Sequence, residues 1–258
     1  MLKTFTARAK RRRPARRSIL ARHAVPERRM ILTDAEVDAV RLSLSIALRS
    51  VLFSLPLAVA VAWLLTRRAL RGRLLLDALV HLPLVLPPVV VGYLLLLLFG
   101  MRGPIGGWLY ENFGIQLVFT SGGAALATAV MSFPLMVRAI RISLEGIDSG
   151  LEDAARTLGA GPWDRFFTVM LPLMLPGILA GAVTAFAAGL GEFGAVITFV
   201  SNIPGETRTL PLALYTALQT PGGDAMAARL ATISFSLGLL GLVTAEFIAR
   251  RVQRMLGR

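Results

Sequence analysis

The chain has 258 residues, of which 55% are hydrophobic and only 17% are charged, and it contains no cysteine. Soluble domains have about a quarter of their residues charged, so this composition argues against a soluble protein. Without cysteine the chain forms no disulfide bond and no thiolate metal site. Residues 1–29 contribute +10 of the net charge of +13, from eleven basic residues and one acidic residue. The basicity is therefore a property of the N-terminal tail.

This tail, residues 1–29, contains the basic run from Lys10 to Arg13 and lacks the apolar stretch of a signal peptide. A basic block can bind nucleic acid or anionic lipid, but no binding fold accompanies this one. We therefore predict that residues 1–29 are disordered, or that the natural chain begins at Met30, where the composition changes. Residues 30–258 then form one membrane domain.

Five apolar blocks predict an all-α, polytopic membrane protein. A run of about 18 or more apolar residues is long enough to cross the hydrocarbon core of a bilayer as a helix. Thr33 and Glu36 have the spacing of a capping box and predict the start of the first helix. The predicted spans lie near residues 42–66, 74–99, 117–137, 171–200 and 230–249.

The second predicted span contains Pro83, Pro87 and Pro88. Proline removes a backbone donor and clashes with the preceding turn, so this span must kink or break. Broken helices are tolerated at membrane depth only where they are buried in protein or line a cavity. The second span is therefore a candidate for the transport pathway.

The fourth predicted span has a stripe of small residues, at every fourth position from 177 to 189: Gly177, Gly181, Ala185 and Gly189. Such a stripe allows two helix backbones to approach closely in lipid. The sequence leaves open whether the stripe packs within the chain or forms a dimer interface.

The placement of arginine predicts the orientation, because short cytoplasmic loops carry an excess of basic residues. Twelve arginines flank the spans on one side, at positions 67, 68, 71, 73, 138, 141, 156, 165, 250, 251, 254 and 258, and three on the other, at 102, 208 and 229. The side with twelve is predicted to be cytoplasmic. Five spans then place the C-terminus in the cytoplasm and the N-terminus outside.

The long cytoplasmic loop, residues 145–172, contains the pattern of a short capped helix. Ser149 and Glu152 have capping-box spacing, Gly159 supplies a left-handed stop, and Pro162 suits the first turn of the next helix. The helix is expected to have about two and a half turns, with one apolar face made of Leu151, Ala155 and Leu158. It is either a docking element or a simple surface helix that links two spans.

This loop resembles the coupling loop of ABC importer permeases, whose pattern is Glu-Ala-Ala, three residues, Gly, nine residues, Ile-x-Leu-Pro. Here the loop reads Asp153-Ala154-Ala155, three residues, Gly159, nine residues, Val169-Met170-Leu171-Pro172. Asp replaces Glu and Val replaces Ile. The resemblance implies the type I importer permease fold and contact with an ATPase through Leu151, Glu152, Asp153, Ala154, Ala155, Leu158, Gly159, Leu171 and Pro172.

Four more segments, residues 81–93, 131–141, 191–195 and 199–209, resemble the permeases of molybdate importers, and the resemblance extends from Met30 to the C-terminus. It implies a homodimer in the bacterial inner membrane, coupled to two ATPase subunits and supplied by an extracytoplasmic molybdate-binding protein. Tungstate and sulfate or thiosulfate remain alternative substrates. The only lysines are Lys3 and Lys10, so no P-loop is possible in the membrane domain. We expect no cofactor, and ATP bound by the partner subunit.

Polar residues gather after the fourth span, around one arginine on the outer side: Thr198, Ser201, Asn202, Thr207 and Arg208. They are predicted to line the outer mouth or gate of the ion pathway, and the alternative is an ordinary outer loop. Glu192 would repel an anion, so we interpret it as a structural or gating residue. His81 is interpreted as an interfacial histidine with a satisfied ring.

Two further classes of protein are alternatives to an importer permease. A secondary transporter would be expected to show internal repeats, and we find no convincing repeat of the spans. A nucleic-acid-binding membrane protein would depend only on residues 1–29. The capped loop favours the importer permease over both, with no nucleic acid among its partners.

Overall fold

The computed structural model describes residues 32–67 and 71–255, and regular secondary structure in these ranges is entirely helical. The expected disorder of the tail, residues 1–29, lies outside the described residues. The helices are α1 Asp34–Thr66, α2 Arg73–Val85, α3 Pro88–Phe99, α4 Pro104–Phe113, α5 Ser121–Glu145, α6 Ser149–Thr157, α7 Pro162–Arg165, the π-helical turn η1 Phe166–Met170, α8 Leu171–Leu190, α9 Gly194–Val200, α10 Leu210–Gln219 and α11 Asp224–Met255.

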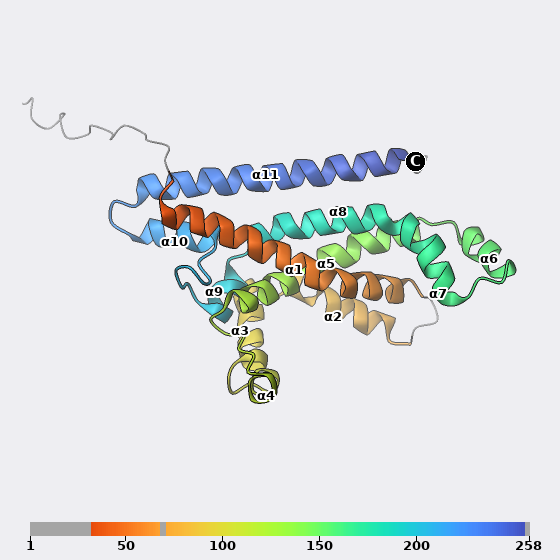
Figure 1. Cartoon of the computed structure of the whole chain (residues 1–258), viewed down its shortest axis with the longest axis horizontal. Helices are drawn as coiled ribbons and strands as arrows, with labels where there is room; N and C mark the ends of the chain where they lie inside the picture. Colours follow the sequence, from red (N-terminus) through yellow and green to blue (C-terminus); the bar gives the residue numbers. More distant parts are fainter. Residues whose placement is uncertain (1–31, 68–70, 256–258) are drawn as a thin grey trace, which may run out of the picture. The chain divides into compact units, whose positions relative to one another are not determined.

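Four helical segments in the described part of the chain are long and apolar enough to cross a membrane: α1, α5, the continuous run from α7 to α8, and α11. A fifth candidate is the pair α2 and α3, which meet at a bend of 116°. The predicted count of about five spans and the all-α class are confirmed. In Figure 1, α11 runs alongside α8, and α1 crosses the same group of helices together with α5.

The first helix begins where the capping box predicts. The side-chain oxygen of Thr33 accepts from the backbone N–H of Glu36 (3.4 Å), and a carboxylate oxygen of Glu36 accepts from the N–H of Thr33 (2.7 Å). The Glu36 side chain is fully buried, and Arg229 of α11 donates to it at 2.8 Å. The cap therefore also fastens the start of α1 to α11.

The second predicted span is broken, as its prolines require. Helix α2 ends at Val85 and α3 begins at Pro88, with Pro87 as the N-cap residue. Pro87 and Pro88 have no N–H to donate back into α2, while proline suits the first position of a new helix. The break turns the chain sharply and does not merely bend one helix.

The fourth span differs from the prediction. Helix α8 ends at Leu190 and does not continue to residue 200, because α9 is a separate helix that packs against α3 and α5. A carboxylate oxygen of Glu192 accepts from the N–H of Ala195 (2.9 Å), which satisfies a free donor at the start of α9.

The third span is also displaced from the prediction. Helix α5 begins at Ser121, after Thr120 caps the N–H of Gly123 (3.1 Å), and it runs to Glu145 instead of ending near residue 137. Two short helices, α4 and α10, lie in segments for which the sequence predicted no helix.

The small-residue stripe of α8 packs within the chain. A Cβ atom added at Gly177 would lie 2.4 Å from the Cβ of Ser143, and one added at Gly181 would lie 3.2 Å from that of Ala139, both on α5. Ala185 is fully buried in the same contact. Close approach of α5 and α8 is therefore the reason for these small residues.

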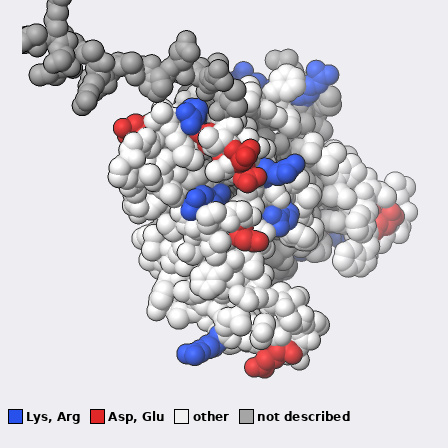
Figure 2. All heavy atoms as spheres, turned by 60° about the vertical axis from the view of Figure 1, so that its left-hand side comes forward, with Lys and Arg blue, Asp and Glu red and all other residues white. Residues whose placement is uncertain are grey.

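The helix ends form two regions on opposite sides of this helical unit. Helices α6 and α7 and the end of α11 lie on one side, whereas α9, α10 and the start of α1 lie on the other (Figure 1). On the face shown in Figure 2, most of the surface is uncharged, and acidic and basic side chains form a few small groups.

Candidate functional site

The capped helix predicted in the long loop is present as α6. It has nine residues and is followed by Gly159 at φ +85°, the left-handed stop that the sequence predicts. The cap itself differs from the prediction, because the residue before the helix supplies it. A carboxylate oxygen of Asp148 accepts from the N–H of Gly150 (2.9 Å). Pro162 opens the next helix, as expected.

One face of α6 is apolar and uncovered. The Leu151 side chain is 47% exposed and that of Leu158 is 87% exposed, with the half-buried Ala155 between them. Ala154 is exposed, and Asp153 forms only an exposed ion pair with Arg156 (3.8 Å). Exposed leucines on a short helix outside the spanning segments cannot be explained by contact with lipid tails. A protein surface is the natural cover for this face.

The loop is joined mechanically to the membrane helices. Glu152 of α6 lies 3.7 Å from Arg165 of α7. Phe166, the next residue, packs edge-on against Trp63 near the end of α1, with ring centroids 5.6 Å apart. The guanidinium of Arg67 lies 4.1 Å above the Trp63 ring. A displacement of α6 would therefore be passed to α1 as well as to α8.

Leu171 and Pro172 lie where the loop passes into α8. Leu171 begins α8, and its N–H bonds to the carbonyl of Phe166, five residues back, which gives η1 its π-helical geometry. Pro172 has no N–H to offer the carbonyl of Thr168, so the regular ladder cannot continue unchanged through this turn. The end of the predicted coupling motif thus coincides with a widened turn.

The polar residues predicted on the outer side form two small sets of side-chain hydrogen bonds. The Arg208 Nε donates to the amide oxygen of Asn202 (2.9 Å), and the Asn202 nitrogen donates to the hydroxyl of Thr216 (2.8 Å). The buried Thr207 hydroxyl donates to the carbonyl of Ser201 (3.1 Å) and accepts from the N–H of Ile203 (2.9 Å). Thr198 instead bonds its own helix, at the carbonyl of Gly194. Thr216 was not predicted, because nothing in the sequence connects it to this loop.

At the opposite end, ion pairs join α2 to α5. Arg141 lies 3.1 Å from Asp77 and 2.8 Å from Glu145. The His81 Nδ1 lies 2.9 Å from the carbonyl of Asp77 and 3.3 Å from its carboxylate. One ring nitrogen of His81 is therefore held by Asp77, and the interpretation as an interfacial histidine stays a prediction.

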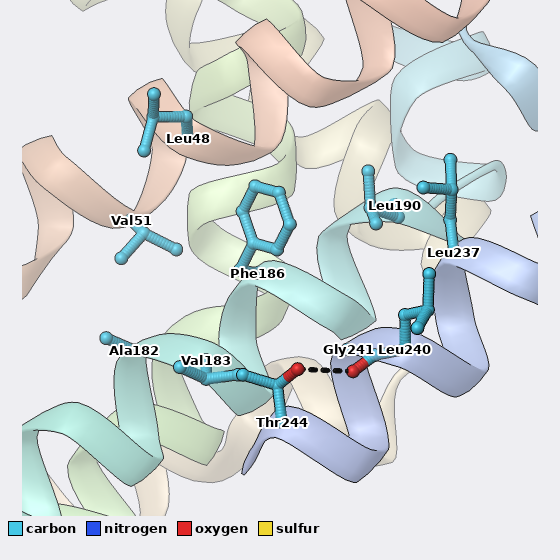
Figure 3. Close-up of a pocket in the computed structure, with 10 residues that line it drawn as sticks. All are labelled: Leu48, Val51, Ala182, Val183, Phe186, Leu190, Leu237, Leu240, Gly241 and Thr244. Atoms are coloured by element: carbon cyan, nitrogen blue, oxygen red, sulfur yellow. Dashed lines mark hydrogen bonds between the residues drawn. The ribbon is translucent and has the colours of Figure 1, made fainter. Parts of the chain in front are cut away.

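Two of the cavities among the described helices bear on an ion pathway. The cavity in Figure 3 has a volume of about 420 Å³ and lies between α1, α8 and α11. Its walls are apolar except for Thr244, whose hydroxyl donates to the carbonyl of Leu240 (2.6 Å; Figure 3). This cavity offers no free polar group to an ion.

The other cavity, of about 810 Å³, contains one charge. Arg49 of α1 lines it together with Ser50, Ser54 and residues of α2, α3 and α5. Arg49 was not among the predicted site residues, although a basic residue inside the predicted span 42–66 could have identified it.

Comparison with known proteins gives a family. Residues 54–254 match the family of the binding-protein-dependent transport system inner membrane component. The chain is 62% identical to the molybdenum transport system permease protein ModB of Escherichia coli strain K12 over 229 residues, which are 89% of this chain and all of that protein. It is 56% identical to the ModB protein of Haemophilus influenzae, over 86% of this chain and 97% of that one.

The fold has counterparts among solved structures. An inward-facing structure of the MetNI methionine ABC transporter contains a chain that matches with a TM-score of 0.66 at 18% identity, over 86% of this chain and 99% of that one. At this identity the likeness concerns the fold alone.

Proposed function

The chain belongs to the family of inner membrane components of binding-protein-dependent transport systems, and from this premise we propose that it is the permease subunit of a molybdate importer. The observation that supports molybdate as the substrate is the 62% identity to a molybdenum permease over that protein's whole length. As a membrane component of such a system, the chain is a translocation subunit and not an enzyme. Family membership implies two kinds of partner, an ATPase and a binding protein.

The ATPase is proposed to bind α6. The exposed apolar face of Leu151, Ala155 and Leu158 offers a docking surface, and the stop at Gly159 keeps the helix short enough to seat in a groove. Glu152, Asp153 and Ala154 complete the helix, and Leu171 and Pro172 fix its connection to α8.

Two copies of the permease are proposed to work together, each on one ATPase subunit. When ATP closes the ATPase pair, the two α6 helices would be drawn together. The Glu152–Arg165 pair and the Phe166–Trp63 contact would pass this movement to α8 and α1. Rigid-body rotation between two packings then switches the pathway from inward-facing to outward-facing.

The outer mouth of the pathway is proposed to include Ser201, Asn202, Thr207 and Arg208, with Thr198 on α9 behind them. Ser201 is exposed and Arg208 is half-buried beside it, whereas the buried Thr207 holds the loop through Ser201 and Ile203. A tetrahedral dianion needs donors and positive potential, but few enough that it can leave again. The periplasmic side is assigned from the arginine count, which places this loop opposite α6.

Molybdate uptake tests the proposal. The chain is expressed in a bacterium that has lost its own molybdate permease but retains the ATPase and the binding protein. We expect uptake of radioactive molybdate to rise about tenfold or more above the background without the chain. Excess tungstate is expected to compete. Restored sulfate uptake with no molybdate uptake would overturn the assignment of substrate.

A matched pair of variants tests the binding of the ATPase to α6. Leu158→Asp places a charge on the apolar face of α6, whereas Thr157→Asp places the same charge on another side of the same helix. We expect Leu158→Asp to abolish both uptake and co-purification of the ATPase, because burying an unpaired charge costs several kcal/mol. Thr157→Asp is expected to keep both within about twofold. If the ATPase co-purifies normally with correctly inserted Leu158→Asp permease, the proposed binding of the ATPase to α6 is contradicted.

A further inference from the structure

The cavity of about 810 Å³ is bordered by α1, α2, α3 and α5. Its walls are mainly apolar side chains, among them Phe53, Leu79 and Phe133. Arg49 is the one charged residue among the described residues that line it. Arg49 lies fifteen residues after the start of α1 and seventeen before its end, so it sits near the middle of a helix about 50 Å long.

The Arg49 guanidinium has only neutral partners. Its Nε donates to the carbonyl of Ser45 in its own helix (3.3 Å), and one terminal nitrogen donates to the hydroxyl of Ser121 on α5 (3.3 Å). Within the described part of the chain, no carboxylate lies within 4.0 Å of it. Arg141 and Arg229, by contrast, each have a carboxylate at 2.8 Å. The positive charge of Arg49 is therefore available to a ligand.

Two features favour water in this cavity. An arginine within a spanning helix faces the bundle interior or a water-filled space, because contact with lipid tails is too costly. Pro83 of the broken pair α2 and α3 lines the same cavity, and broken helices occur at membrane depth only inside protein or along such spaces. At about 30 Å³ for each water, the volume has room for a hydrated ion.

We propose that Arg49 is an oxyanion contact within the membrane, a second station that a tetrahedral dianion occupies after it leaves the outer mouth. This inference rests on the proposed function for the identity of the ion. The hydroxyl groups of Ser50 and Ser54 lie in the same wall and donate to carbonyls of α1 at 2.8 and 2.5 Å, so each oxygen can still accept a bond from water around the ion. The guanidinium is the element that attracts the anion.

A single guanidinium suits transport better than a cluster of cations. Conduction requires a site that binds strongly enough for the ion to enter and weakly enough for it to leave. One guanidinium leaves half of a dianion's charge to water, so release remains possible. The planar fork of arginine also matches two oxygens of an oxyanion, which a lysine ammonium cannot do in the same geometry.

Transport by the whole complex gives the first test. The permease, its ATPase and the molybdate-binding protein are reconstituted in proteoliposomes with wild-type, R49Q, R49K or R41Q permease. Glutamine keeps a donor for Ser121 without the charge, and Arg41 is an exposed arginine on the same helix. We expect molybdate uptake to fall about tenfold or more in R49Q, while R49K retains at least a third and R41Q is unchanged. ATP hydrolysis stimulated by the binding protein should stay within about twofold in all variants.

Three results of this test overturn the proposal. Uptake by R49Q at the wild-type rate would show that transport does not need the charge of Arg49. This result is expected if Arg49 binds a lipid phosphate instead of the transported ion. Equal losses in R49Q and R49K would show that the charge is not what matters. Loss of assembly or of ATP hydrolysis together with uptake in R49Q would show a structural role.

A second test does not depend on the identity of the ion. Because the chain has no cysteine, the A129C variant places a single thiol in the cavity wall. We expect anionic and cationic methanethiosulfonates to modify it, and R49Q to lower the ratio of anionic to cationic rates about fivefold. An unreactive thiol, or an unchanged ratio, contradicts a hydrated cavity with an anion-attracting Arg49. If wild-type permease carries no molybdate but this ratio falls, the substrate assignment fails and the site remains.

Discussion

At the scale of single residues, the orientation of Arg208 is set by an amide and not by a carboxylate. Asn202 accepts from its Nε, and Asn202 is held in turn by Thr216 of α10. Among the described residues, no acidic group lies within 4.0 Å of Arg208. A neutral partner fixes the direction of the guanidinium without cancelling its charge, which is the arrangement that an anion site needs.

We expect Arg208→Ala to lower oxyanion uptake about tenfold at low external concentration, since a hydrogen bond from a charged donor to an anion is worth about 1.5–3 kcal/mol. Arg102→Ala removes an exposed arginine that the same count of charges places on the outer side, and it should leave uptake unchanged. The measurement is the initial rate of oxyanion uptake by the two variants, compared at equal expression. Unchanged uptake by Arg208→Ala would show that the loop is an ordinary connection between helices.

At the scale of helices, α5 and α8 pack closely through small side chains. The small side chains of α8 lie against Ala139 and Ser143 of α5, and Met136, Ile140 and Met174 are fully buried beside them. Between membrane helices, such packing replaces the hydrophobic effect as the source of stability.

Gly177→Ala should therefore destabilise the protein by about 1–3 kcal/mol, because the new methyl group would overlap the Ser143 side chain. Gly238→Ala on α11 is the matched control, since a Cβ atom there meets nothing within 4 Å. Thermal unfolding of the detergent-solubilised protein should show a lower Tm for the first variant and an equal or higher Tm for the second. Equal midpoints for both variants would mean that α5 and α8 can separate without cost.

The sequence predicted those features of the helices that depend on neighbouring residues. The capping box at Thr33, the stop at Gly159 and the break after Val85 each follow from local backbone chemistry, and the structure confirms all three. The apolar run after Glu192 resembled a continuation of α8. It is a separate helix because the Glu192 carboxylate bonds to the start of α9.

Features that depend on distant residues could not be predicted. The third span continues past Arg138, and within this extension Arg141 pairs with Asp77 of α2, 64 residues away. Arg49 donates a hydrogen bond to Ser121, which lies 72 residues further along the chain, and no pattern in a single sequence predicts this contact. Helix α6 could be predicted because its signals are local and match a family pattern, whereas the cavity between helices required the structure.

At the scale of the whole molecule, the helices give the described unit two distinct ends. Helix α6 and the end of α11 share one end, and α9, α10 and the start of α1 share the other (Figure 1). The arginine count assigns the first end to the cytoplasm. A permease needs this polarity, because the ATPase and the binding protein must act on opposite sides of the membrane.

Single-cysteine variants of this cysteine-free chain test the polarity directly. We expect Glu206→Cys, in the loop before α10, to react with a membrane-impermeant thiol reagent in spheroplasts. Thr157→Cys, on α6, should react only in inside-out vesicles. Both positions are exposed, so accessibility within the protein is matched. Labelling of Thr157→Cys in intact spheroplasts would reverse the assigned orientation.

The π-helical turn η1 has one further consequence, for the direction in which side chains point. Its five-residue bond to Phe166 takes up more chain per turn than the α-helical ladder does. Residues before and after it are therefore out of phase on a common helical wheel, by up to the roughly 100° that one residue spans. The aromatic face that meets Trp63 and the small-residue face that meets α5 are thus set independently. A change in the direction of the loop can therefore leave the packing of α8 against α5 intact.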